Sequence, residues 1–233
     1  MTAKSAIPST SESVDDYLKA ILALGGSEEE RVTSSALAQR LGVRAASVTG
    51  MLQKLAAQRP PLVAYERHHG ARLTAAGKRR AWELVRHHRL LELFLHDVLK
   101  YSWDEVHEEA ERLEHFISER FEDRVAAILG HPDVDPHGHA IPQKHESGSF
   151  QEQVSLNELP LNMPATISAV SDRDSAALRE IERLGLRLGI PVTIEHKKSG
   201  ASVTARIGEE GRRLRIAKEL AANIYVNRDS NAM

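Results

Sequence analysis

The chain has no cysteine and no long apolar run, and each absence excludes a class of protein. Without cysteine, its 233 residues can form no disulfide, no thiolate metal site and no cysteine nucleophile. No apolar stretch approaches the ~18 residues that a membrane-spanning helix needs. The first residues, MTAKSAIPSTSES, lack the apolar segment of a secretory signal. We therefore expect a soluble, cytoplasmic protein that has no membrane partner.

Acidic residues are also missing from one region, although the net charge of the chain is only −2. None occurs from Arg31 through Tyr65. Residues 1–89 contain 14 Lys and Arg against 8 Asp and Glu, whereas residues 90–155 contain 5 against 15. Residues 156–233 are nearly balanced, with 12 against 10. This segregation predicts an N-terminal part that meets a polyanion and a middle part that gathers cations.

The N-terminal part has the pattern of a winged helix-turn-helix. An amphipathic helix is predicted over Val14–Gly26, followed by two short helices over Thr33–Gly42 and Arg44–Gln58. Two short helices joined by a tight turn are the helix-turn-helix signature. The next stretch, PLVAYERHHGARLT, predicts a strand, a basic turn and a second strand before a long helix over Thr74–Leu99.

The candidate DNA contacts lie on the second helix of this motif, because that helix enters the major groove. Arginine reads guanine, serine and threonine bind phosphate or base, and small residues allow close approach. Hydroxyls at the start of the preceding helix and basic residues of the wing can hold the phosphate backbone. Any one of them could be an ordinary surface residue, but together they favour nucleic acid. The candidates are Ser34, Ser35, Arg44, Ala46, Ser47, Thr49, Gln53, Lys54, Arg67 and Arg72.

The acidic middle part contains the stretch HEEAERLEH, within a helix predicted over Asp104–Leu129. His107, Glu111, Glu114 and His115 stand at i, i+4, i+7 and i+8, which places them on one side of that helix. Apolar neighbours set these groups at the edge of a buried face, where a charge must be paired or bind a metal.

A second, shorter constellation lies on the preceding helix, where His88 and Glu92 repeat the i, i+4 spacing. A single charged stretch is more often a solvated helix face, and that interpretation is the alternative. Two such constellations on consecutive helices favour metal. Oxygen and imidazole donors without sulfur suit Mn²⁺ and Fe²⁺.

The rest of the chain divides into a loop and a small β-rich part. Gly130–Phe150 is rich in Pro, Gly and His, which predicts a loop and linker. From Val154 onward, short strands with turns predict a small β domain. An apolar fraction of 41% is enough for real cores in one large or two ordinary domains.

Taken together, these pieces resemble the diphtheria toxin repressor family of metal-dependent regulators, in particular its manganese-responsive branch. The matching motifs occur in the family's order over residues 15–142: DDYLKAIL, ALAQRLGVRAASVTGMLQKL, YERHHGARLTAAGKRRA, HHRLLELFL, VHEEAERLEH and DVDPHGHAIP. The C-terminal part is similar to the SH3-like (FeoA-like) domain of longer members.

The resemblance implies a mainly α fold with β structure. It consists of a winged helix-turn-helix DNA-binding domain (1–75), a helical metal-binding and dimerisation domain (76–142), a linker (143–152) and an SH3-like β-barrel (153–233).

By position, the resemblance implies two metal sites per subunit. The primary, activating site falls on Asp16, Glu111, Glu114 and His115. The ancillary site falls on His88, Glu92 and His107. The helical-face pattern groups His107 with Glu111 instead, and here we follow the family pattern.

Two positions depart from the family pattern. Lys19 stands where manganese-branch members often have a carboxylate that bridges two close metals, which predicts two separated single-metal sites. In the SH3-like domain Asp174 is the candidate for a further ligand, but the next expected ligand position holds Ala177.

We therefore expect a metal-activated DNA-binding transcriptional regulator, and not an enzyme, that represses metal-uptake genes. The expected cofactor is Mn²⁺ or Fe²⁺, and the expected partners are a second copy of the chain and a palindromic double-stranded operator. The candidate dimer-face residues, for which intrachain core is the alternative, are Leu90, Leu91, Phe94 and Val98. The rival functions are a metal-dependent hydrolase and a metal buffer with an incidental basic domain, although no separate nucleophile or acid–base pair supports the hydrolase.

Overall fold

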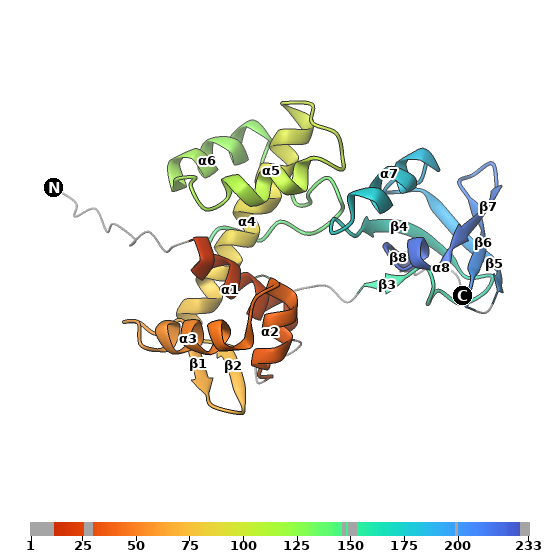
Figure 1. The fold of residues 1–233 in the computed structure, drawn as a ribbon. Coiled ribbons are helices and arrows are strands. Elements are labelled where there is room, and N and C mark those ends of the chain that lie inside the picture. The colour runs from red at the N-terminus through yellow and green to blue at the C-terminus, as the bar shows by residue number, and fades with distance from the viewer. Residues whose placement is uncertain (1–11, 26–29, 146–147, 149–152, 199, 229–233) are drawn as a thin grey trace. The chain divides into compact units, whose positions relative to one another are not determined.

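The structure is a computed structural model that describes residues 12–25, 30–145, 148, 153–198 and 200–228 (Figure 1). The chain divides into two compact units. The first comprises Met1–His87, Glu114–Phe116 and Pro142–Gly148, and the second comprises His88–Leu113, Ile117–Ile141 and Ser149–Met233. Much of the linker expected at 143–152 lies outside the described residues.

The first unit is a winged helix, as the sequence predicts. Its elements are α1 (Glu12–Leu24), α2 (Ser34–Leu41), α3 (Ala45–Ala56), β1 (Val63–Glu66), β2 (Gly70–Leu73) and the start of α4 (Ala75–Asp97). Strands β1 and β2 pair antiparallel to form the wing. The cap of α2 is Thr33, whose hydroxyl accepts from the amide of Ala36, so Ser34 and Ser35 lie in the first turn rather than at the cap.

An apolar core holds these elements together. Leu18 and Ile21 of α1 pack with Leu37 of α2 and with Leu52 and Leu55 of α3 in one cluster. The turn of the wing ends at Gly70, whose φ is 92° and where a Cβ would lie 2.4 Å from the carbonyl oxygen of Val32. Only glycine allows the backbone to come this close, so the wing packs against Val32, which precedes α2.

The second unit contains the rest of α4 and two further helices, α5 (Val106–Leu113) and α6 (Glu119–Ile128). The single helix expected over Asp104–Leu129 is therefore wrong. The break falls at Ser118, whose hydroxyl accepts from the amide of Phe121 and caps α6. Glu114 and His115 consequently lie in a turn and not on the helical face that the spacing predicted.

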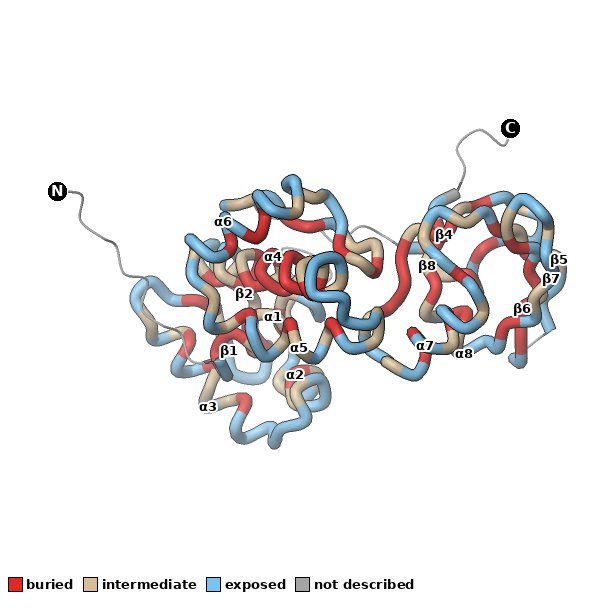
Figure 2. Tube along the Cα trace, turned by 90° about the horizontal axis from the view of Figure 1, so that it is seen from above, coloured by how far each residue is buried: buried red, intermediate tan, exposed pale blue. Residues whose placement is uncertain are grey.

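Most of the middle of α4 is buried (Figure 2). Leu90 packs with Val125 and Ala126 of α6, and Leu91 packs with Val106 of α5. For Leu90 and Leu91 the intrachain core is thus the correct interpretation, whereas Val98 is 43% exposed.

The C-terminal part of this unit is a six-stranded antiparallel sheet. Its strands are β3 (Val154–Ser155), β4 (Pro164–Val170), β5 (Pro191–Lys198), β6 (Ser202–Ile207), β7 (Arg212–Ala217) and β8 (Ile224–Arg228), in the order β3-β8-β4-β5-β6-β7. Helices α7 (Ser175–Arg183) and α8 (Lys218–Ala221) contribute Leu178, Ile181 and Ala221 to its core. No pairing joins β3 to β7 in the described residues, so the expected barrel is an open sheet here. Across the described helices, none is both long and apolar enough to cross a membrane.

Candidate metal centre and DNA-binding surface

The second unit brings His88, Glu92 and His107 together, as the ancillary set predicts. Glu92 Oε1 lies 3.0 Å from His88 Nε2 and 3.1 Å from His107 Nδ1, and the two nitrogens are 3.0 Å apart. Neighbouring donors around an octahedral ion at about 2.1 Å are separated by about 3.0 Å. A single divalent ion bound to all three atoms therefore fits the triangle they form. The Glu92 side chain is 0% exposed, so its charge requires a positive partner, which an ion or the neighbouring imidazoles can supply.

Glu111 supports this triangle from behind. Its Oε2 lies 3.2 Å from His88 Nδ1, the ring nitrogen that faces away from Glu92. A carboxylate on one imidazole nitrogen fixes the ring so that the other nitrogen presents its lone pair to a metal. Glu111 was predicted as a primary ligand, but in the second unit its contact is with an ancillary residue.

In the sheet domain Asp172, and not the candidate Asp174, faces the cluster of His88, Glu92 and His107. Asp174 is the cap of α7, where its carboxylate accepts from the amides of Ala176 and Ala177. Asp172 instead faces the triangle, with Oδ2 3.8 Å from His107 Nδ1. The group His88, Glu92, His107 and Asp172 offers ligand atoms that all lie within 4.8 Å of one another.

The carboxylates of this cluster are held in the charged form. Burial raises the pKa of Glu92, but His88, His107 and His137 outweigh it and bring that pKa well below its usual value. Burial and the charge of Glu92 raise the pKa of Asp172, and the imidazoles of His139, His107 and His88 lower it on balance. Ionised carboxylates are the form that binds a metal.

In the first unit, three of the four predicted primary ligands meet. His115 Nε2 lies 3.5 Å from Asp16 Oδ1 and 3.6 Å from Glu114 Oε1, while Lys19 Nζ lies 2.7 Å from that same Glu114 oxygen. The fourth, Glu111, belongs to the second unit. Two carboxylates and an imidazole suit a hard divalent ion. The ammonium of Lys19 neutralises part of the negative charge of this cluster.

A buried ion pair that the sequence analysis missed orients His115. Arg80 donates to both oxygens of Asp15, at 3.0 and 2.9 Å, and Asp15 Oδ2 lies 3.3 Å from His115 Nδ1. Asp15 is fully buried, so the Arg80 fork compensates its charge. The ring is thereby turned so that Nε2 faces Asp16 and Glu114.

The predicted DNA contacts lie on the outer side of the winged helix. Helix α3 buries Val48, Leu52 and Leu55 and exposes the opposite side, including Ser47, Gln53 and Lys54. Arg44 occupies the cap position of α3 and is exposed, with no side-chain capping bond. The remaining candidates occupy the first turn of α2, the first turns of α3 and the wing: Ser34, Ser35, Ala46, Thr49, Arg67 and Arg72.

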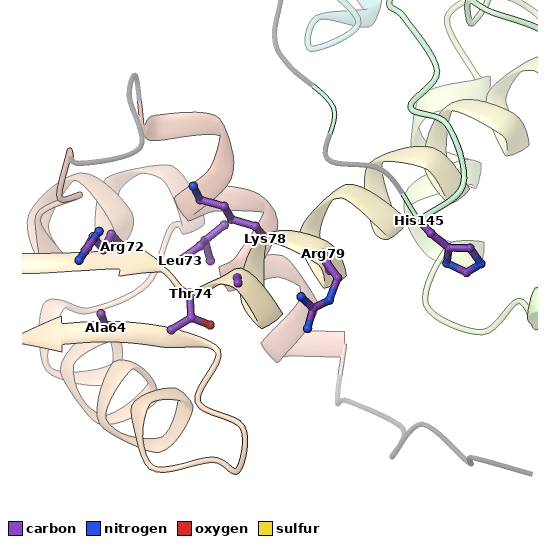
Figure 3. A pocket seen from close by; sticks show the side chains of 8 residues that line it. Ala64, Arg72, Leu73, Thr74, Lys78, Arg79 and His145 are labelled. Carbon is purple, nitrogen blue, oxygen red and sulfur yellow. The ribbon is translucent and has the colours of Figure 1, made fainter. Parts of the chain in front are cut away.

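A basic hollow lies between the wing and the start of α4 (Figure 3). It has a volume of about 540 Å³ and includes Arg72 of β2, Lys78 and Arg79 of α4 and His145 among its lining residues. None of its lining residues is acidic. Lys78 and Arg79, which the sequence analysis did not select, thus extend the basic surface beyond the predicted residues.

A winged helix joined to buried clusters of carboxylates and imidazoles defines a DNA-binding protein that responds to metal. Family models agree: residues 9–71 match the "Iron dependent repressor, N-terminal DNA binding domain", residues 74–143 the "metal binding and dimerisation domain", and residues 154–228 the "FeoA domain". The chain belongs to the diphtheria toxin repressor family of iron-dependent repressors. Members of this family are repressors and not enzymes, which leaves the hydrolase interpretation without support.

Individual relatives support the same assignment. The chain is 34% identical over 165 residues to the iron-dependent repressor IdeR of Mycobacterium tuberculosis, covering 67% of this chain and 70% of IdeR. It is 32% identical over 126 residues to the regulator MntR of Bacillus subtilis, covering 54% and 86%. A solved manganese-dependent transcriptional repressor in complex with manganese superposes with a TM-score of 0.83 at 33% identity, covering 93% of this chain and 100% of the other.

Metal binding to the Asp16 cluster should depend on pH. Burial lowers the pKa of His115, but Asp15, Asp16 and Glu114 outweigh it and raise that pKa from 6.5 to about 10. A metal must therefore displace a proton throughout the neutral range, and Mn²⁺ affinity should rise by up to about tenfold per unit between about pH 6 and pH 8. Asp15→Asn, which removes the first of these charges, should flatten the slope. Equal affinity of the wild type at both pH values would show that His115 is neutral before the ion arrives.

Asp172 and Asp174 should respond differently to substitution. Asp172→Ala should lower the affinity for Mn²⁺ at the His88 cluster and leave the unfolding free energy of the metal-free protein nearly unchanged. Asp174→Ala should keep the metal affinity and lose about 1 kcal/mol of stability, because the cap of α7 is lost. Equilibrium dialysis and urea unfolding measure the two quantities. The assignment fails if metal affinity falls only in Asp174→Ala.

Proposed function

We propose that the chain is a metal-activated transcriptional repressor in which an ion at Asp16, Glu114 and His115 controls the DNA-binding unit. The observation that carries this proposal is the position of Asp16 on α1. Val14, Leu18 and Ile21 of the same helix pack into the core shared with α2 and α3. An ion held by Asp16 therefore fixes the position of α1. The shared core transmits this constraint to α3, the helix that is proposed to enter the major groove.

The proposed ion is Mn²⁺ or Fe²⁺, with one ion at the primary site and one at the ancillary site of each subunit. The resemblance to the family assigns Glu111 to the primary set, and we retain that assignment as part of the proposal. Within the second unit, Glu111 also contacts His88. When bound, the ion supplies a double positive charge that neutralises the clustered carboxylates. The donor set suits hard ions, and the relatives of the chain include both iron-dependent and manganese-dependent repressors.

Lys19 supports the proposal of two separated single-metal sites. Its ammonium already neutralises one oxygen of Glu114, at 2.7 Å. An entering ion has to compete with this internal cation for Glu114, whereas a second, bridging metal would find a positive charge in its way.

On DNA, we propose that a homodimer binds a palindromic operator in the cytoplasm and represses genes for metal uptake. The dimerisation domain is part of the family match, and Phe121 and Ile128 of α6 expose apolar surface, at 43% and 65%. The contacts are proposed to come from α3, the first turn of α2, the wing and the basic hollow. Metal acts as corepressor by binding the DNA-competent state more tightly than the other states.

The test is an operator titration with and without Mn²⁺, on the wild type, Asp16→Ala and the control Glu12→Ala on the exposed side of α1. Mn²⁺ should raise operator affinity of the wild type and of Glu12→Ala by roughly 5- to 150-fold. Asp16→Ala should keep the metal-free affinity and lose most of that gain. Fluorescence anisotropy reads the affinity, and random DNA serves as the competitor. Full metal-dependent binding by Asp16→Ala would remove α1 from the mechanism.

A further inference from the structure

The outer face of the sheet domain is rich in basic side chains. Strands β5, β6 and β7 are neighbours in the sheet (Figure 1), and successive residues of a strand point to opposite faces. Ala205 and Ile207 of β6 and Ile216 of β7 belong to the core, so the residues that alternate with them point outward. The exposed basic residues on this outward side, which we call the basic face, are Lys198, Arg206, Arg213 and Arg215.

Two arginines of the basic face are direct cross-strand partners. In the antiparallel pairing of β6 with β7, Arg206 stands opposite Arg213. Like charges in this position destabilise a sheet, because the Cβ atoms of opposite residues are only about 5 Å apart. Glu195 compensates Arg213, with Oε2 2.8 Å from Nε, but no carboxylate among the described residues forms an ion pair with Arg206. The stability of the sheet therefore does not account for Arg206, whereas a bound anion would.

Hydroxyl groups lie among these charges. Thr193 of β5 is the cross-strand partner of Arg206, and Thr204 of β6 is the partner of Arg215. Arg215 also donates from Nε to the hydroxyl of Ser202, at 3.0 Å, which holds its guanidinium against β6. Guanidinium and hydroxyl groups are the donors that proteins commonly present to the phosphate oxygens of nucleic acid.

Protection of the sheet edge is the alternative role for these charges. Strand β7 is the last strand of the sheet, and charged side chains on an edge strand oppose pairing with other chains. This role accounts for Arg213 and Arg215 of β7. It does not account for Arg206, because β6 is paired on both sides, or for Lys198 on β5. The charge thus covers three strands and is not confined to the edge.

The extent of the basic face indicates the size of its ligand. Lys198 stands opposite Ser202, and Arg206 lies four residues farther along β6. At the rise of a β-strand, the charges extend over about 13 Å. Glu209 and Glu210, in the turn that follows β6, limit the face at that end. Charges spread over this length suit a polyanion with successive phosphates better than a single small anion.

The basic face has little to offer a protein partner. Protein interfaces are centred on buried aromatic and other apolar side chains. None of the large apolar side chains that are exposed in the described part of the chain lies on β5, β6 or β7. Interfaces with DNA are more polar and more positively charged, as this face is. The charge pattern therefore favours nucleic acid over an acidic protein.

We propose that the basic face of the sheet domain binds the phosphate backbone of DNA, in addition to the contacts of the winged helix. Contacts with phosphate carry no direct sequence information, so this one raises the affinity for operator and for other DNA alike. The inference rests on the proposed function only in its partner, which is the DNA that the winged helix binds. It gives the sheet domain a role in DNA binding besides its contribution of Asp172 to the His88 cluster.

The experiment measures binding of the full chain to operator and to random DNA, with Mn²⁺ present, between about 50 and 200 mM salt. Arg206→Gln/Arg215→Gln should weaken binding to both DNAs by the same factor. The slope of log affinity against log salt should fall by about one unit for each lost contact. Arg206→Lys/Arg215→Lys retains the charges and should keep most of the slope.

The matched control is Arg183→Gln/Arg187→Gln, which removes the same charge from the end of α7 and the loop after it. Leu178 and Ile181 of α7 pack into the core, so this helix covers the opposite side of the sheet and the control should keep the wild-type slope. An unchanged slope in Arg206→Gln/Arg215→Gln overturns the proposal. An equal fall in the control also overturns it, because the effect would then follow net charge alone.

Polyglutamate in place of DNA tests the competing partner. If Arg206→Gln/Arg215→Gln loses affinity for polyglutamate and keeps its affinity for DNA, the face takes an acidic protein and the proposal is overturned. Failure of the proposed function is recognised separately. DNA affinity of the wild type that does not respond to Mn²⁺ contradicts the metal-activated repressor, while the salt slopes still decide whether the basic face contacts DNA.

Discussion

The buried carboxylate of Glu92 is the constraint around which the second unit is organised. Three imidazoles, from α4, α5 and the loop after α6, converge on a side chain that is 0% exposed. Removing a carboxylate from water costs several kcal/mol unless opposite charge and hydrogen bonds compensate it. Asp172 brings a further acid from the sheet domain to the same place. Metal binding and the packing of this unit are therefore coupled, because the carboxylates of Glu92 and Asp172 attract an ion and repel each other.

In the first unit, basic side chains of the protein compensate the buried carboxylates. Arg80 compensates Asp15, and Lys19 compensates Glu114, so the unit carries positive charge of its own beside two of its buried carboxylates. Asp16, whose side chain is 39% exposed, remains on the accessible side of His115. In the proposed function, the metal completes a cluster that is already oriented, and the free energy of metal binding holds α1 in place. This division explains how a regulator can be stable in both states and still respond to metal.

Much of this was predictable because local patterns carry it. Short stretches of sequence predict the helix caps, the turn of the wing at Gly70 and the i, i+4 pair of His88 and Glu92. The turn at Glu114 and His115 was missed, because Leu113, Phe116 and Ile117 continue the apolar rhythm of a helix and only the cap at Ser118 breaks it. Asp172 could not be told from Asp174 by spacing, since only the fold shows which carboxylate caps α7. His137 was treated as loop, although the acid and histidine content of DVDPHGH was a visible signal.

Anomalous diffraction at the manganese edge, from crystals grown with Mn²⁺, tests most directly whether these clusters are metal sites. The account predicts one peak bound by His88, Glu92 and His107 and another bound by Asp16, Glu114 and His115, each within about 2.3 Å of its nitrogen and oxygen donors. Manganese found only on exposed carboxylates, with both clusters filled by water or by protein side chains, would contradict it.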